Sequence, residues 1–186
     1  MISRRGFLRS VLGAAGVCGL GGRFSAWAAA SARAGNSPEK VLSLHNVHTG
    51  ERLSTRYCAD GCYDENELGR INYILRCHYT NIVKPINLNV IDLLCDIKDR
   101  LVPDKEITII SGYRSPEYNE YLKRLGRHVA AGSLHMAGLA IDFAIAGIGM
   151  GELCRTAKLF ASGGVGKYPE FVHIDVGRVR YWQDGI

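Results

Sequence analysis

The feature that most constrains the fold of this chain is an alternation of side chains over residues 139–145. Bulky apolar residues occupy the odd positions, and small residues flank one carboxylate at the even positions: Leu139, Ile141, Phe143 and Ile145 against Ala140, Asp142 and Ala144. A period of two is typical of a β-strand with one face in the core. The other face leaves room for a cleft above Asp142. Taken alone, Asp142 is better explained as a solvated acid on an exposed sheet face.

A second alternating stretch, residues 171–176, carries groups of the same kind. Val172, Ile174 and Val176 share one face, and Phe171, His173 and Asp175 share the other. His135 precedes Asp142 by seven positions, and Gly138 between them allows a sharp turn into the strand. Two imidazoles and one carboxylate can bind zinc and leave a fourth position for water. A single histidine on a strand is more often structural, but His135, Asp142 and His173 together predict a metal site.

Two further residues stand where hydrolysis at such a site needs them. Glu170 lies three positions before His173 and is a candidate for taking a proton from water. In an unbroken strand that offset places the two side chains on opposite faces, but Tyr168 and Pro169 make Glu170 part of a loop. Arg114 has a planar guanidinium that can hold a substrate carboxylate or carbonyl. A salt bridge to a helix acid explains Arg114 equally well.

The rest of the pattern after the N-terminal segment predicts one α+β domain without repeats or linkers. Alternation and β-branched runs indicate strands, and apolar spacing of three and four indicates helices. The predicted elements are strands at residues 40–47, 52–57 and 106–111 and helices at residues 65–79, 89–101 and 115–125. Asp64 is the expected N-cap of the first helix, and Pro116 fits the first turn of the third.

The first 34 residues are expected to be an export signal and not part of the fold. They include SRRGFLR, which matches the twin-arginine pattern of bacterial export, followed by a mild apolar run and small-residue cleavage options. The run at residues 11–22 is short, rich in Gly and Ala, and closed by Arg23, so no stable membrane anchor is expected. We therefore predict a signal peptide at residues 1–34, a domain at residues 35–186 and a periplasmic location.

The formal net charge of +5 comes from that signal. Five of the 23 Lys and Arg residues lie in the first 34 positions, which hold no acid, so the other 18 balance the 18 acidic residues. A neutral domain gives no support for a phosphate-binding surface, and no nucleic-acid partner is expected.

The cysteines leave several alternatives open. Val17 stands where lipid attachment at Cys18 needs a small residue, and five cysteines follow the signal: Cys58, Cys62, Cys77, Cys95 and Cys154. An odd number leaves at least one unpaired in an oxidising compartment. Cys58 and Cys62 flank a turn and can form a bridge, or most cysteines are small buried residues. A zinc knuckle with His45 or His48 is weaker, because a second C-x-x-C is missing.

Three segments together resemble the zinc D-Ala-D-Ala peptidase family, which has the hedgehog/DD-peptidase fold. They are SGYRS at residues 111–115, SLHMAGLAID at 133–142 and GGVGKYPEFVHIDVGRVRYW at 163–182. The similarity runs over about residues 40–182 and falls in the branch of YcbK-like murein endopeptidases. It implies a small antiparallel sheet with flanking helices and a peptidoglycan substrate.

The resemblance also implies roles for individual residues. The zinc ligands would be His135, Asp142 and His173, the general base Glu170, and the arginine on the substrate Arg114. Ser133 and Asp175 would orient the ligands through hydrogen bonds. Relatives often carry a couple more residues between Tyr-Pro and Phe-Val-His than this chain does.

The sequence therefore predicts a zinc-dependent murein peptidase that hydrolyses peptide bonds of the stems or cross-links. One alternative is a non-catalytic zinc-containing module that binds the cell wall. Another is a non-haem iron oxygenase, because His173 and Asp175 form an H-x-D pair. That class usually needs a later histidine, and none follows Asp175. Sequence does not distinguish D,D from L,D bonds, or endopeptidase from carboxypeptidase action.

Overall fold

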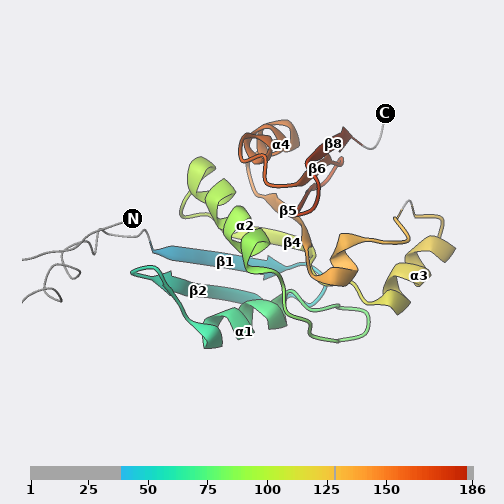
Figure 1. Ribbon diagram of the computed structural model, residues 1–186, viewed down its shortest axis with the longest axis horizontal. Coiled ribbons are helices and arrows are strands. Elements are labelled where there is room, and N and C mark those ends of the chain that lie inside the picture. Colours follow the sequence, from blue (N-terminus) through green and yellow to red (C-terminus); the bar gives the residue numbers. More distant parts are fainter. Residues whose placement is uncertain (1–38, 128, 184–186) are drawn as a thin grey trace, which may run out of the picture. The chain divides into compact units, whose positions relative to one another are not determined.

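A computed structural model describes residues 39–127 and 129–183 of the 186-residue chain. The predicted export signal lies outside the described residues. Figure 1 shows the elements, which follow one another as β1 (Lys40–Asn46), β2 (Arg52–Ala59), β3 (Cys62–Tyr63), α1 (Glu65–Ile74), α2 (Leu88–Leu101), β4 (Ile107–Ser111), α3 (Pro116–Arg124), the 3-10 turn η1 (Leu134–Ala137), β5 (Ala140–Ile145), α4 (Met150–Leu159), β6 (Gly164–Lys167), β7 (Val172–Asp175) and β8 (Arg180–Gln183).

The eight strands of the described region form one mixed sheet in the order β3-β2-β1-β4-β5-β7-β6-β8. Most neighbours are antiparallel, but β1 pairs with β4 and β6 pairs with β8 in parallel. The α+β class is confirmed, whereas the expected small antiparallel sheet is wrong in size and in strand direction. A parallel pair needs a long connection between its two strands, and other elements supply that connection here. Helices α1 and α2 lie between β1 and β4, and β7 lies between β6 and β8.

Helix α1 begins where the sequence predicts and ends earlier. The carboxylate of Asp64 accepts the backbone N–H groups of Asn66 and Glu67, which caps the first turn. Apolar spacing continues to Tyr79, but the helix ends at Ile74. Beyond it the carbonyl of Leu75 accepts the N–H of Tyr113 at 2.7 Å, which ties this end of the helix to the segment after β4. Tyr79 is half exposed in the following loop.

The apolar face of the central strands forms the core that supports the site. Ile141 and Phe143 of β5 and Val172 and Ile174 of β7 are fully buried. Helix α2 contacts β1 and β7, and helix α4 contacts β5, β6 and β7. Burying one such side chain contributes about 1.5–3 kcal/mol, so the strands that carry the candidate ligands are firmly held.

The register of β5 and β7 determines which side chains share the opposite face. Asp142 lies opposite His173, and Ala140 lies opposite Asp175. Directly opposed residues of an antiparallel pair project to the same side of the sheet, with Cβ atoms about 4.5–5.5 Å apart. The alternation seen in the sequence therefore brings Asp142, His173 and Asp175 to one face.

The cysteines of the described residues are free thiols. Cys62 pairs with Ala59 across the β2–β3 hairpin, and Cys58 precedes Ala59 on the same strand. Successive strand residues project to opposite faces, so Cys58 and Cys62 point apart and do not form the bridge considered from the sequence. Cys62 is exposed, whereas the other four cysteines are buried as small core residues.

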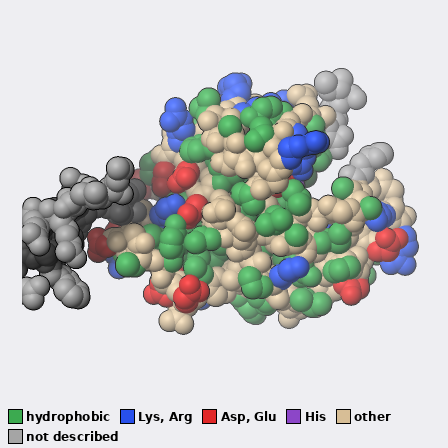
Figure 2. All heavy atoms as spheres, in the orientation of Figure 1, with side chains coloured by type: hydrophobic (Ala, Val, Ile, Leu, Met, Phe, Trp, Pro, Cys, Tyr) green, Lys and Arg blue, Asp and Glu red, His purple; other side chains and the backbone are tan. Residues whose placement is uncertain are grey.

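Charged side chains of both signs are scattered over the face of the molecule shown in Figure 2, where they are interspersed with apolar ones. Among the described helices, none is long and apolar enough to span a bilayer.

Candidate metal centre

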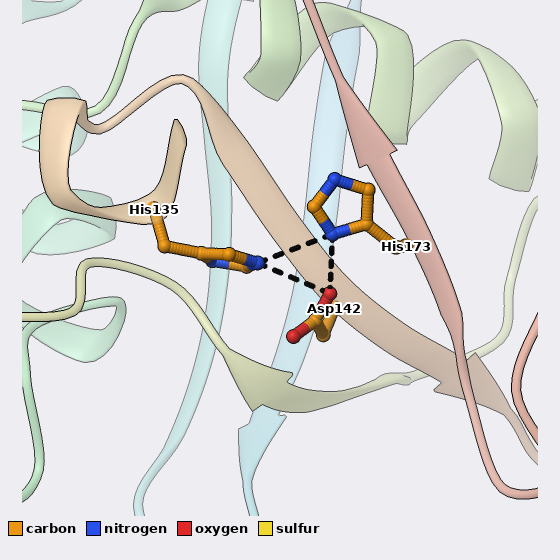
Figure 3. A group of neighbouring side chains, drawn as sticks. All are labelled: His135, Asp142 and His173. Atoms are coloured by element: carbon orange, nitrogen blue, oxygen red, sulfur yellow. Dashed lines mark hydrogen bonds and ion pairs between the residues drawn. The ribbon is translucent and has the colours of Figure 1, made fainter. Parts of the chain in front are cut away.

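Three side chains from three separate elements meet on the polar face of the sheet (Figure 3). His135 comes from η1, Asp142 from β5 and His173 from β7. His135 Nε2 lies 3.2 Å from both Asp142 Oδ1 and His173 Nδ1, and that Nδ1 lies 2.7 Å from the same Oδ1. All three side chains are buried. Within residues 39–127 and 129–183 no second group of His, Cys, Asp and Glu has a geometry that could hold an ion.

Hydrogen bonds behind the two rings determine which nitrogens face the centre. His135 Nδ1 lies 2.8 Å from the carbonyl oxygen of Gly112, which can only accept, so Nδ1 carries the proton. His173 Nε2 lies 3.1 Å from Asp175 Oδ2, and that carboxylate likewise makes Nε2 the donor. The remaining nitrogens, His135 Nε2 and His173 Nδ1, point at each other and at Asp142. Metal-binding histidines are usually backed by acceptors in this way.

A cation fits this arrangement because three possible ligand atoms converge in one buried place. Two imidazole lone pairs and a carboxylate oxygen lie within 3.2 Å of each other in a buried place. Burial disfavours charge on His173, but hydrogen bonds to Asp142 and Asp175 outweigh it and raise the pKa of His173 to about 9. Burial also opposes ionisation of Asp142, yet His135 and His173 hold the pKa of its carboxyl well below the ordinary value. At His135 burial outweighs the neighbouring carboxylate and lowers the pKa, which keeps the Nε2 lone pair available as a ligand.

Two glycines fix the position of η1. Gly138 ends the turn with φ of 70°, in the left-handed region, and a Cβ there would lie 2.5 Å from the carbonyl oxygen of Pro85. A Cβ at Gly112 would collide with the backbone of Leu75. The sharp turn predicted at Gly138 is present, and both its backbone conformation and the nearby Pro85 carbonyl require a glycine there.

The three side chains lie on the wall of a cavity of about 650 Å³, a size that suits a small ligand or part of a peptide. Arg114, which follows β4, lines the same cavity and is 8% exposed. Its Nη2 lies 3.5 Å from both Asp142 Oδ2 and Ser111 Oγ, and its Nε has no hydrogen-bond partner. A buried donor without an acceptor is costly, so a ligand that offers an acceptor to Arg114 would be favoured.

The other predicted site residues fall in different places. Asp175 is fully buried behind His173. Ser133 lines the cavity and makes no side-chain capping bond to η1. Glu170 is exposed in the loop between β6 and β7 and does not line the cavity, although Tyr168 and Phe171 do. The catalytic role of Glu170 and the orienting role of Ser133 stay predictions.

Several residues that line the cavity were not singled out as site residues from the sequence. His48 reaches it because the turn after β1 lies beside the end of β4, where His48 Nε2 is 3.0 Å from the carbonyl oxygen of Ile110. Arg180 and Trp182 reach it from β8. These positions depend on strand pairings between distant segments, for which single-sequence periodicity gives no signal.

Two imidazoles, one carboxylate and a buried arginine thus lie together in one cavity of a mixed-sheet α+β domain, and the first three could hold a metal ion. A family model described as peptidoglycan L,D-endopeptidase MepK matches residues 34–182, and the chain belongs to this family. The resemblance noted from the sequence motifs is thereby confirmed.

Relatives with this name cover most of the chain. The peptidoglycan L,D-endopeptidase MepK of Escherichia coli strain K12 is 37% identical over 145 residues, which are 77% of this chain and 80% of that protein. The probable peptidoglycan L,D-endopeptidase MepK of Haemophilus influenzae is 36% identical over 147 residues, with coverage of 77% and 79%. No solved structure matches the chain.

Proposed function

We propose that this protein is a zinc-dependent murein peptidase that hydrolyses L,D-peptide bonds in peptidoglycan stems or cross-links. The observation that carries the proposal is the convergence of His135, Asp142 and His173 on the wall of one cavity. Membership of the MepK family supports a peptidoglycan substrate. The name of the relatives is the reason for choosing L,D over D,D bonds.

Zinc is the proposed ion because of the donor set. Two imidazole nitrogens and one carboxylate oxygen, with a position left open, are typical of catalytic zinc sites. The acceptors behind both rings, Gly112 and Asp175, would hold the ligands ready. A bound zinc ion would lower the pKa of a water molecule and polarise a carbonyl group.

Arg114 would hold the carbonyl oxygen of the scissile bond as negative charge develops on it. Its guanidinium lies beside Asp142 and lines the cavity, and it would supply the donor. Removing one donor of this kind typically lowers kcat by about 10²–10³.

Glu170 is proposed as the residue whose carboxylate takes a proton from the attacking water and passes it to the leaving amine. Its loop would have to turn the carboxylate into the cavity, and Tyr168 and Phe171 already place the loop at the cavity wall. We expect Glu170→Gln to keep its metal content and lose turnover, because an amide accepts no proton. The matched control is Glu152→Gln, an exposed acid on α4. Wild-type rates in Glu170→Gln would remove Glu170 from this role.

The second candidate function is a zinc-containing module that binds the wall without cutting it, and the exposure of Glu170 is the observation that favours it. Digestion of purified murein, with metal content measured in parallel, separates the two. The peptidase should release fragments whose masses identify cleavage at L,D bonds. A binding module would hold zinc and sediment with murein but release nothing.

A periplasmic location by the twin-arginine route is part of the proposal and is supported by the SRRGFLR segment. Changing Arg4 and Arg5 together to Lys should retain the protein in the cytoplasm, which cell fractionation would detect. Unchanged export of this double variant would contradict the route.

A further inference from the structure

Four residues place five donor nitrogens around the carboxylate of Asp175, although it is fully buried. Backbone N–H groups of Gly164 and Gly177 donate to Oδ1 at 2.9 and 2.8 Å. His173 Nε2 lies 3.1 Å from Oδ2. The guanidinium of Arg180 spans both oxygens, with Nη1 at 3.1 Å from Oδ1 and Nη2 at 2.7 Å from Oδ2.

The distribution of these donors gives Arg180 a distinct part. Both glycine N–H groups hold Oδ1, whereas Oδ2, the oxygen that accepts from His173, is held otherwise by Arg180 alone among the described residues. Among the described residues, Arg180 is the basic side chain that forms a salt bridge with the buried carboxylate of Asp175. A buried carboxylate needs such a partner, and two-point contacts with a guanidinium fix its orientation as well as its charge.

We propose that Arg180 is a positioning residue of the metal site, which acts through Asp175 to hold His173 with Nδ1 facing the ion. The proposal rests on the proposed function, because Arg180 has this role only if the site holds a metal. Without the guanidinium, Oδ2 would be free to turn, and the imidazole of His173 would lose the fixed acceptor that sets its tautomer and its rotation.

The sequence of the two last strands of the sheet is adapted to bring Arg180 to this place. In the parallel pairing of β6 and β8, Gly164 lies opposite Arg180, and Gly166 lies opposite Trp182. A Cβ at Gly164 would collide with the Asp175 carboxylate and the Arg180 guanidinium, and a Cβ at Gly166 with the indole of Trp182. The two glycines of β6 therefore leave the space that the two large side chains of β8 occupy.

Arg180 is itself held from its other side. Its guanidinium lies 5.0 Å from the ring centroid of Trp182, and its Nη1 donates to the carbonyl of Arg178 at 3.0 Å. Trp182 in turn donates from Nε1 to the hydroxyl of Tyr168 at 3.1 Å. The rival explanation is that Arg180, which also lines the cavity, binds substrate directly.

The test compares Arg180→Gln and Arg180→Lys in the full chain. The matched control is Arg178→Gln, because the exposed Arg178 contacts Arg180 only through its backbone carbonyl. Zinc affinity is measured by competition with a chelator. The absorption spectrum of the Co²⁺-loaded protein reports the geometry of the ligands. The values of kcat and KM are measured with murein as substrate.

For Arg180→Gln we expect zinc affinity to fall by about 10–100-fold, a shifted Co²⁺ spectrum, and lower kcat with unchanged KM. Arg180→Lys keeps the charge but not the two-point contact, so its zinc affinity should lie between those of Arg180→Gln and the wild type. If Arg180→Gln does not fold, as judged by circular dichroism, Arg180→Lys takes its place in the comparison with the wild type. Arg178→Gln should match the wild type.

Unchanged metal binding in Arg180→Gln would overturn the positioning role. Unchanged zinc affinity and Co²⁺ spectrum with raised KM would make Arg180 a substrate contact, and unchanged affinity with only a lower melting temperature would make it a purely structural residue. Wild-type protein that binds neither ion would overturn the proposed function as well. If the wild type and Arg180→Gln bind zinc equally well, the positioning role alone is overturned and the proposed function stands.

Discussion

His78 is a residue outside the metal centre whose ionisation is set by its packing. Its ring stacks on His48 with centroids 3.8 Å apart and meets the edge of Tyr118 at 4.8 Å. Burial, and then unfavourable electrostatic interactions with His48 and Arg114, lower the pKa of His78 to about 4. The folded protein therefore keeps His78 neutral at pH values where an unfolded chain, with an ordinary histidine pKa of about 6.5, binds a proton.

This difference predicts a pH dependence of stability. Between pH 6.5 and about 4 the unfolded state binds the extra proton, so the free energy of unfolding should fall as the pH falls through this window. One proton corresponds at most to about 1.4 kcal/mol per pH unit. His78→Phe keeps an aromatic ring in the stack and should flatten the decline, as measured by urea unfolding at several pH values. Equal slopes in the variant and the wild type would contradict the assignment.

For individual residues, the sequence predicted the candidate ligands better than the groups that hydrogen-bond to them. His135, Asp142 and His173 follow from a local turn and from two strands whose alternation is visible in the sequence. The pairing of Asp175 with Arg180 does not follow, because it depends on the return of β8 beside β6. The acceptor of His135 is a backbone carbonyl, that of Gly112, which residue types do not reveal.

Among the elements, η1 carries the ligand His135 on a turn of four residues, and its end at Gly138 predicts a specific sensitivity. Gly138→Ala should destabilise the protein by about 1–2 kcal/mol or more, because a left-handed residue with a Cβ is strained and the Cβ would meet Pro85. Chemical denaturation gives the value. The control is Gly132→Ala on the approach to η1, where a Cβ meets no atom within 4 Å and φ is not positive. An equally stable Gly138→Ala would mean that η1 can shift without cost.

The predicted elements agree with the structure where patterning is local and fail where long-range pairing decides. The strands around Ile141 and Ile174 were visible because their apolar positions alternate. Strand β6 was not predicted, since Gly164 and Gly166 have low strand propensity, and its neighbours β7 and β8 hold it in the sheet. Helix α1 ends before Tyr79, where the carbonyls of Ile74 and Leu75 accept hydrogen bonds from Asn46 and Tyr113 and not from residues four positions later.

For the whole molecule, a metal that binds only the folded state should add to stability. The ligands come from η1, β5 and β7, which unfolding would separate. At a free zinc concentration of 100 times Kd the gain is about 2.7 kcal/mol. A chelator should therefore lower the melting temperature of purified protein and abolish activity, and added zinc should restore both. His135→Ala is the control whose melting temperature should not respond to zinc, and a chelator-insensitive wild type would contradict the site.

The places of the ligands along the chain also restrict when an ion can be acquired. His135 and Asp142 lie in η1 and β5, whereas His173 lies in β7 and Arg180, which holds the carboxylate behind it, lies in β8. The last parts of the site are therefore made only with residues 172–183. A growing polypeptide that does not yet include residue 173 offers no complete set of ligands. The choice between competing ions therefore belongs to the compartment in which the full-length chain first becomes native.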